Sequence, residues 1–251
     1  MLVVVAHPDD ETFGTGSVIA HAAATAVEVV VCCATRGEAG EDASGTTSSA
    51  AELAQVRERE LHAAATALGA SEVVLFEFGD SDMEGPAPDH ALTSVPIEHV
   101  VDAVAAVIAR VRPDVVVTLD PVSIADHRDH VRIGEATTLA FERVSHDGAR
   151  LYYWTLARSI MDRWAEEMRA LGLLPQYVDL ELGRHDHEIT TIVAVDDVLD
   201  VRRAAVREHR TQMSPFAAVS PELQHALLTR DHLVRVVPPW NGGPVETSLF
   251  G

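Results

Sequence analysis

The sequence predicts an α/β fold: a Rossmann-like parallel sheet with helices on both faces, followed by a small C-terminal extension. Apolar strand-like runs alternate with segments of helical periodicity, which is the order of a βαβ chain. The strand-like runs are apolar along nearly their whole length, as expected of parallel strands that helices cover on both faces. Polar loops follow several of these runs, at the edge where open sheets of this kind bind ligands.

The first half of the chain supplies four strands and three helices in alternation. The helix over residues 50–68 shows the basis, because Leu53, Leu61 and Leu68 recur at helical spacing and Gly69 follows as a natural stop. The predicted strands span residues 2–6, 28–34, 72–78 and 114–120, and the predicted helices span residues 17–25, 50–68 and 97–111.

The second half continues the alternation and then ends in a loop-rich tail. From Ser214 onward the chain is rich in proline and loop residues, with a short helical stretch over residues 221–228. We predict one domain over residues 1–251, with a Rossmann-like core at about 1–145 and a C-terminal part at about 146–251. In that second half, helices are expected over residues 130–143, 159–171 and 198–210, and strands over residues 151–156 and 189–195.

Composition excludes several classes of function. The formal net charge of −20 argues against a nucleic-acid partner. No apolar run approaches the roughly 20 residues that a membrane helix needs, and the apolar start lacks a basic leader, so we predict a cytoplasmic protein without a membrane span. The alanine- and valine-rich helices suit packing within a monomer or between subunits, which leaves a homo-oligomer open.

The cysteine content excludes a disulfide framework. Only Cys32 and Cys33 occur, side by side in a predicted strand where successive side chains point to opposite faces. We interpret them as buried thiols rather than as ligands of one metal.

Ionisable side chains cluster after the first and fourth strands. His7 and Asp10 lie three residues apart in the motif AHPDDE, and His127 and His130 form an HxxH pair in the motif DHRDH. An imidazole, a carboxylate and a second imidazole are a common ligand set for catalytic zinc, which keeps one position open for water.

The neighbours of these ligands have chemical roles available to them. Asp9 can take a proton from the water as a general base, and His127 can stabilise an oxyanion or protonate a leaving amine. Asp129 can orient a histidine through the second nitrogen of its ring.

A dinucleotide site is the alternative use of such a sheet. The first loop contains Gly14-Thr15-Gly16, but Ile19 occupies the position of the third glycine in GxGxxG, and carboxylates precede the loop. The sequence therefore disfavours a nucleotide-binding oxidoreductase.

AHPDDE together with DHRDH resembles the LmbE-like, or PIG-L, superfamily of zinc-dependent N-deacetylases. The resemblance runs from Met1 to about Gln212. It implies a Rossmann-like fold without a nucleotide, zinc held by His7, Asp10 and His130, Asp9 as the general base, and His127 polarising the tetrahedral intermediate.

Further segments resemble the family less closely. TRGEAGE resembles its TxGExG segment, the helix containing Arg57 resembles the one whose arginine reaches the substrate, and FGDSDM resembles a loop that nominates Asp80 for sugar hydroxyls. Asp82 replaces the glycine of that loop. EHRTQ resembles a late HxSQ element, which places His209 near the pocket or at the end of the last helix.

Other positions depart from the family pattern. Ala125 stands where some members carry a tyrosine, and Arg128 stands at the usual proline without an evident catalytic meaning. We interpret His185 and His187 as residues of a solvated loop rather than as contacts of a substrate or a second metal.

These observations predict a zinc-dependent hydrolase that removes an acyl group, most simply acetyl, from the nitrogen of a small-molecule amino-sugar conjugate. One alternative is an amidase of thiol-pathway conjugates with a larger acyl group. Another is a non-catalytic metal- or sugar-binding protein, against which the intact Asp9 argues, because a structural zinc site needs no base.

Overall fold

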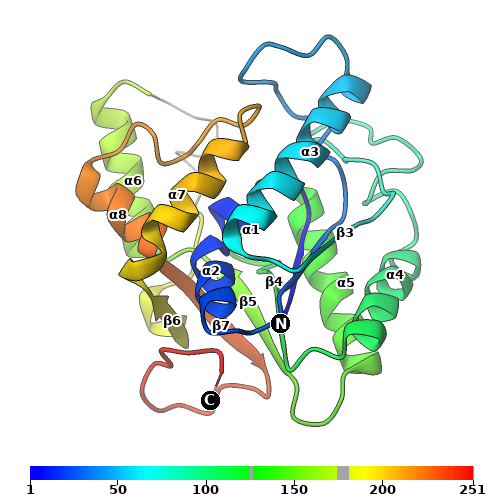
Figure 1. Ribbon diagram of the computed structural model, residues 1–251, viewed down its shortest axis with the longest axis vertical. Helices are drawn as coiled ribbons and strands as arrows, with labels where there is room; N and C mark the ends of the chain where they lie inside the picture. Colours follow the sequence, from blue (N-terminus) through cyan, green and yellow to red (C-terminus); the bar gives the residue numbers. More distant parts are fainter. Residues whose placement is uncertain (125–126, 174–180, 251) are drawn as a thin grey trace.

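The computed structural model describes residues 1–124, 127–173 and 181–250, and it contains one seven-stranded sheet. The strands follow the order β3-β2-β1-β4-β5-β7-β6 (Figure 1). The predicted α/β class is confirmed. The strands are β1 (Leu2–Val5), β2 (Val30–Cys33), β3 (Glu72–Leu75), β4 (Val115–Leu119), β5 (Arg150–Thr155), β6 (Thr191–Ala194) and β7 (Arg230–Val237).

The helices connect these strands as the alternation predicts, with short additions. They are α1 (Asp10–Phe13), α2 (Gly16–Ala24), α3 (Ala50–Leu68), α4 (Ile97–Val111), α5 (Arg128–Val144), α6 (Arg158–Ala170), α7 (Leu199–Glu208) and α8 (Pro221–Thr229), with the 3-10 turns η1 (Asp186–Glu188) and η2 (Asp196–Val198). Helix α1 was not expected: it is a single turn that begins inside the AHPDDE motif.

Strands β1 to β5 run parallel, and β7 departs from the prediction. Strand β1 pairs with β2 on one side and with β4 on the other, and both pairs are parallel. Strand β7 lies antiparallel between β5 and β6. The tail therefore contains a strand where we expected loops. The segment DHLVRVV did not suggest a strand because it includes charged side chains and follows α8 directly.

The helices cover both faces of the sheet (Figure 1). Helices α4 and α5 pack against each other on one face, whereas α3 and α2 pack against α7 on the other. Helix α3 begins and ends where its sequence predicts: the Ser49 side chain accepts a hydrogen bond from the Glu52 N–H, and Gly69 ends it with a φ of 87°.

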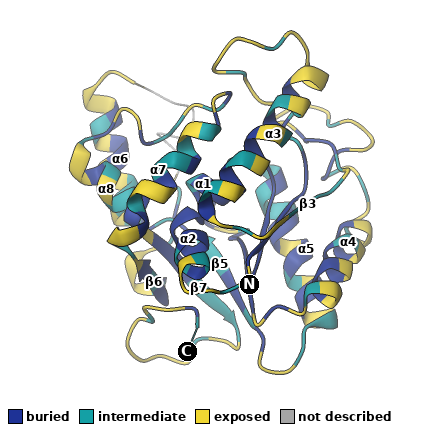
Figure 2. Cartoon of the chain, in the orientation of Figure 1, coloured by how far each residue is buried: buried dark blue, intermediate teal, exposed yellow. Residues whose placement is uncertain are grey.

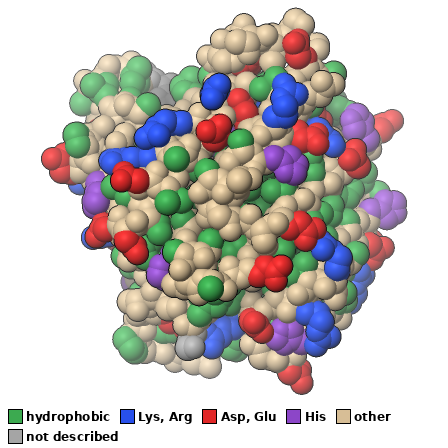
Figure 3. Space-filling view, viewed as in Figure 1, with side chains coloured by type: hydrophobic (Ala, Val, Ile, Leu, Met, Phe, Trp, Pro, Cys, Tyr) green, Lys and Arg blue, Asp and Glu red, His purple; other side chains and the backbone are tan. Residues whose placement is uncertain are grey.

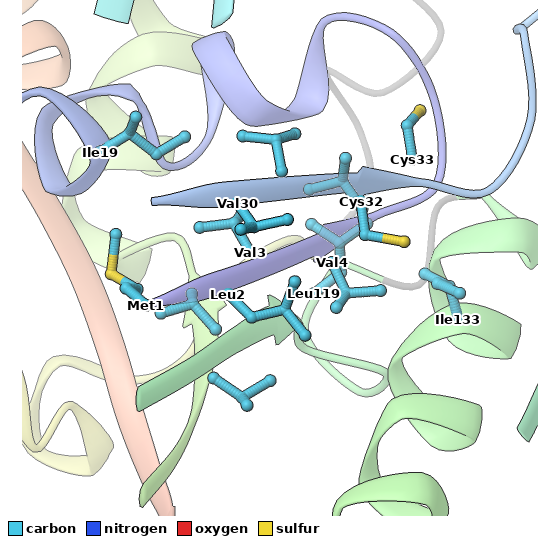
Figure 4. Packing of buried hydrophobic residues seen from close by; sticks show 14 of the residues in the cluster. Met1, Leu2, Val3, Val4, Ile19, Val30, Cys32, Cys33, Leu119 and Ile133 are labelled. Carbon is cyan, nitrogen blue, oxygen red and sulfur yellow. The ribbon is translucent and has the colours of Figure 1, made fainter. Parts of the chain in front are cut away.

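The core lies between the sheet and these helices (Figure 2). Every residue of β1, β2 and β4 is buried, which explains why these strands are apolar throughout. Cys32 and Cys33 are buried and free, and they point to opposite sides of β2 (Figure 4). Within the described part of the chain, no helix combines the length and the apolar character that crossing a membrane requires. The face in Figure 3 shows acidic and basic side chains interspersed.

Candidate active site

The candidate site lies where the sheet changes its winding direction. Strands β1 and β4 are neighbours, but the chain leaves β1 towards the α2 face and leaves β4 towards the α5 face. Such a switch point opens a crevice beyond the carboxyl ends of the two strands. The AHPDDE loop and the DHRDH segment both begin there, which brings together residues that are about 120 positions apart.

The three predicted metal ligands converge at this crevice. His7 Nδ1 lies 3.7 Å from Asp10 Oδ2, and His130 Nε2 lies 3.4 Å from Asp10 Oδ1. One potential ligand atom from each residue lies within 4.8 Å of the others. The carboxylate of Asp10 also accepts the N–H of Ala6 at 3.2 Å and the N–H of His7 at 2.9 Å, so the turn into α1 fixes its orientation.

The second nitrogens of both imidazoles are bound elsewhere in the protein. His7 Nε2 lies 3.2 Å from Asp129 Oδ2, and His130 Nδ1 lies 3.2 Å from the carbonyl of Ile124. These partners leave His7 Nδ1 and His130 Nε2 facing Asp10, in the manner of metal-ligating histidines. The residues therefore fit a divalent metal with imidazole and carboxylate ligands, such as zinc.

The charges around His7 favour a cation. Burial alone would lower the pKa of His7, but the hydrogen bond to Asp129 and the charges of Asp80 and Asp10 raise it. For Asp10, burial opposes ionisation, but His130 and His7 outweigh it and keep the pKa of that carboxyl below its usual range. The carboxylates of Asp129, Asp80 and Asp10 favour a positive charge at His7, and a bound metal ion would supply that charge in place of a proton on the ring.

His127 occupies the N-cap of α5 and faces the same crevice. Its Nδ1 accepts the N–H of Asp129 at 3.1 Å, so the neutral ring carries its proton on Nε2. That nitrogen lies 3.9 Å from Asp80 Oδ1. Burial, together with the neighbouring His7 and His130, lowers the pKa of His127 to about 4. His127 is thus a neutral hydrogen-bond donor at neutral pH.

Asp9 is held in a strained turn beside the ligands. Its φ of 121° lets its carbonyl accept the N–H of Thr12 at 3.0 Å and that of Phe13 at 2.7 Å at the start of α1. Burial, and then the charge of Asp10, raise the pKa of Asp9 to about 7. This value suits a group that exchanges protons near neutral pH.

A buried pair beneath Asp9 was not assigned from the sequence. Glu11 and His209 are both completely buried, and His209 Nε2 lies 2.7 Å from Glu11 Oε1. The other oxygen of Glu11 accepts the N–H of Asp9 at 3.0 Å. His209 therefore lies near the pocket and also directly follows the last residue of α7, so both positions that its motif predicted are observed. The sequence signal that could have identified Glu11 is its position as the last residue of AHPDDE, which lies in α1 with its side chain buried.

The two predicted substrate contacts, Arg57 and Asp80, are both buried but lie in different surroundings. Arg57 is 5% exposed, and its guanidinium donates to the carbonyl of Gly37 at 2.5 Å and to Gln212 Oε1 at 2.6 Å. Asp80 is also 5% exposed, and its Oδ1 lies 3.7 Å from His7 Nε2. Arg57 therefore holds the TRGEAGE loop, whereas Asp80 lies among the catalytic candidates.

Asp129 links His7 to the loop that follows β3. It is fully buried, and its Oδ2 also accepts the N–H of Ser81 at 2.9 Å, a contact that the sequence did not suggest. Its Oδ1 has no hydrogen-bond partner within the described residues. Asp129 also belongs to a second group of potential metal ligands, together with His7, Asp80 and His127.

The remaining predicted positions lie away from this centre or outside the described residues. His185 and His187 are exposed at η1, with their rings stacked 5.7 Å apart, as expected of a solvated loop. Ala125, where some relatives carry a tyrosine, lies outside the described residues.

Comparison of the sequence with known families and proteins identifies a family and several relatives of this chain. Residues 2–141 match the family described as PIG-L: GlcNAc-PI de-N-acetylase. The chain is 32% identical over 275 residues to the 1D-myo-inositol 2-acetamido-2-deoxy-alpha-D-glucopyranoside deacetylase of Actinosynnema mirum, covering 100% of this chain and 96% of that protein. The enzyme of the same name from Saccharomonospora viridis is 34% identical over 269 residues, covering 100% and 99%.

Solved structures share the fold. The N,N'-diacetylchitobiose deacetylase from Pyrococcus horikoshii has a TM-score of 0.63 at 19% identity, covering 94% of this chain and 82% of that chain. The 4-carboxy-2-hydroxymuconate hydratase from Pseudomonas putida has a TM-score of 0.61 at 20% identity, covering 97% and 98%. A hydratase among them means that the fold does not by itself specify the reaction.

Proposed function

The chain belongs to the GlcNAc-PI de-N-acetylase family, and from that premise we propose that it removes the N-acetyl group of an N-acetylglucosamine-type conjugate with the help of one zinc ion. It is an enzyme, a deacetylase that hydrolyses an amide bond. The observation that carries the proposal is the convergence of His7, Asp10 and His130 beside the carboxyl of Asp9.

His7 Nδ1, the Asp10 carboxylate and His130 Nε2 would hold the ion, and the hydrogen bonds from Asp129 and Ile124 would fix both rings. When bound, zinc supplies Lewis acidity, which polarises an amide carbonyl and lowers the pKa of water. With three protein ligands, His7, Asp10 and His130, a zinc ion would keep a further position for water and substrate, as catalytic zinc does.

Asp9 and His127 would move and stabilise charge. Asp9 accepts the proton of the attacking water, since a carboxyl with a pKa of about 7 is about half ionised near neutral pH and can both take and return a proton there. It can return that proton to the leaving amine. His127 donates from Nε2 to the oxyanion that forms at the amide carbon, and its low pKa keeps the ring neutral while it does so.

One carboxylate oxygen of the half-buried Glu38 supports a substrate that carries hydroxyl groups. Glu38 Oε1 accepts the N–H of Asp80 at 2.9 Å, whereas Glu38 Oε2 is buried without a partner within the described residues. Such an acceptor suits a sugar or polyol hydroxyl. The relatives named above act, by their names, on an inositol glycoside of N-acetylglucosamine, so an inositol conjugate is the first substrate to test.

The test is acetate release from a panel that runs from free N-acetylglucosamine to its inositol, malate, lipid and glycopeptide conjugates. Zinc should be supplied at one equivalent per chain, because a teicoplanin deacetylase of similar fold has a zinc inhibited form. Wild type should release acetate, Asp9→Asn should retain zinc with turnover reduced about 100-fold or more, and the exposed control Asp102→Asn should match wild type.

Other outcomes would change the proposal in distinct ways. Equal turnover by wild type and Asp9→Asn would remove Asp9 from the role of base. Release of a larger acyl group but not of acetate would replace the acetyl specificity with that of an amidase. Absence of zinc binding would contradict the metal-dependent reaction altogether.

A further inference from the structure

Arg128 binds a loop that carries a candidate active-site residue. Its guanidinium donates from Nε to the carbonyl of Asp82 at 2.8 Å and from Nη1 to that of Gly85 at 2.9 Å. Nη2 donates to the carbonyl of Ser81 and, at 3.3 Å, to that of Glu84. One side chain at the start of α5 thus binds four carbonyls of a loop more than 40 positions earlier in the chain.

The same loop places Asp80 in the crevice. The N–H of Asp82 donates to Asp80 Oδ1 at 2.9 Å, and Asp82 adopts a φ of 61°, a conformation that a residue with a side chain seldom takes. Ser81, between them, donates its N–H to Asp129 at 2.9 Å. The position of the Asp80 carboxylate therefore depends on a strained turn, and Arg128 binds the carbonyls of that turn.

Arg132, one helical turn after Arg128, holds the far part of the same connection. Its Nη2 donates to the carbonyl of Thr93 at 2.6 Å. Thr93 also donates from its N–H and its hydroxyl to Ser81 Oγ, at 3.0 and 2.8 Å. Helix α5 therefore anchors the connection between β3 and α4 at both ends, through arginines on one face.

We propose that Arg128 is a positioning residue: it fixes the turn at residues 80–85, and with it the Asp80 carboxylate, against the helix that carries His127 and His130. This inference rests on the proposed function for its consequence in catalysis, but the contacts are independent of any substrate. A planar guanidinium with five donors can bind several carbonyls at once, which a lysine ammonium cannot do in the same geometry.

The test compares Arg128→Ala and Arg128→Lys with Arg143→Ala. Arg143 is the matched control, because it lies on the same helix and pairs with Asp102 at 2.8 Å, away from the loop. Hydrogen exchange of peptides covering residues 78–92 should be at least about tenfold faster in both Arg128 variants than in wild type, and unchanged in Arg143→Ala. Exchange elsewhere should stay the same.

Kinetics provide a second readout. On an accepted substrate, kcat/KM should fall about tenfold in both Arg128 variants, the effect of losing one charge-assisted hydrogen bond. Zinc affinity should change by less than about threefold, because no ligand is bound by Arg128. Millimolar guanidinium should restore part of the activity of Arg128→Ala but none of Arg128→Lys, whose side chain still fills the position.

The two proposals fail separately. Unchanged loop exchange in Arg128→Ala would overturn the positioning role, whatever the activity. Full activity in that variant, with a loosened loop, would also overturn it. If wild type cleaved no member of the panel, the deacetylase proposal would fall, while faster exchange in both Arg128 variants would still support the structural anchor.

Discussion

The guanidinium of Arg202 should stabilise both the fold and the candidate metal site, because it binds the carbonyls at the end of α1. It donates to the carbonyls of residues 12–14 at 2.7 to 3.1 Å, to Ser17 Oγ at 2.7 Å and to Asp231 Oδ1 at 2.7 Å. Arg202 and Asp231 are each 1% exposed. Helix α1 begins with the proposed metal ligand Asp10, so this ion pair supports the turn that presents it.

The expected magnitude follows from the burial of both charges. Removing one partner of a buried ion pair strands the other charge and typically costs about 3–5 kcal/mol, whereas replacing both by apolar groups costs far less. Arg202→Met and Asp231→Leu should therefore each lower the free energy of unfolding by about 3–5 kcal/mol. The double variant should lose less than either single variant, which gives a coupling energy of about 3 kcal/mol or more.

Urea unfolding at constant pH measures these free energies, first without metal and then with excess zinc over a chelator-buffered range. The zinc-induced gain in stability should be smaller in Arg202→Met than in wild type, because the turn that carries Asp10 is less well fixed. A loss below about 1 kcal/mol, or strictly additive single losses, would refute this reasoning. An unchanged zinc gain would confine Arg202 to a structural role.

Three further predictions concern separate parts of the chain. Burial lowers the pKa of His232 to about 4, whereas in the unfolded chain it is about 6.5. Between these two values the unfolded chain binds a proton that the folded chain does not, so the free energy of unfolding should fall by about 3 kcal/mol from pH 7 to pH 4. His232→Gln should make unfolding free energy less steeply dependent on pH in that window, and an identical slope would contradict the assignment. Gly134→Ala places a Cβ 2.5 Å from the carbonyl oxygen of Leu119, so the free energy of unfolding should fall by about 1–3 kcal/mol. Thermal unfolding measures this loss as a lower Tm, and an unchanged Tm would be inconsistent with the contact. His130→Ala should weaken zinc binding more than about 100-fold in a chelator competition, whereas the exposed control His185→Ala should bind zinc like wild type.

Local patterns predicted much of the fold because burial on both faces leaves a plain signal. Strands β1, β2 and β4 are apolar at every position but one, and α3 and α4 begin and end at the predicted residues. Strand β7 escaped prediction because it carries Asp231, whose charge is balanced by Arg202 from another element. Charged residues are typical of loops, so a sequence pattern predicts a loop where a strand carries a buried charge whose partner lies in another element.

In the site, too, the residues within local motifs could be predicted, but contacts between distant positions could not. The motifs nominated His7, Asp10 and His130, and the structure brings these three together. The link between His7 and Asp129 joins positions 122 apart, and no spacing in the sequence specifies it. Arg128 had no evident role in the sequence, since its partners are backbone carbonyls, which every residue type possesses.

The antiparallel strand β7 has a consequence for the order in which the chain can fold during synthesis. Strand β6 pairs with β7 and is separated by it from β5, so β6 has no place in the sheet until residues 230–237 have emerged from the ribosome. The same segment brings Asp231 to Arg202, which holds the first turn after β1. The turn at residues 12–14 is thus fully supported only after residues 230–237 are made, and a nascent chain that stalls before residue 230 would carry the proposed ligands His7, Asp10 and His130 without a rigid site for an ion.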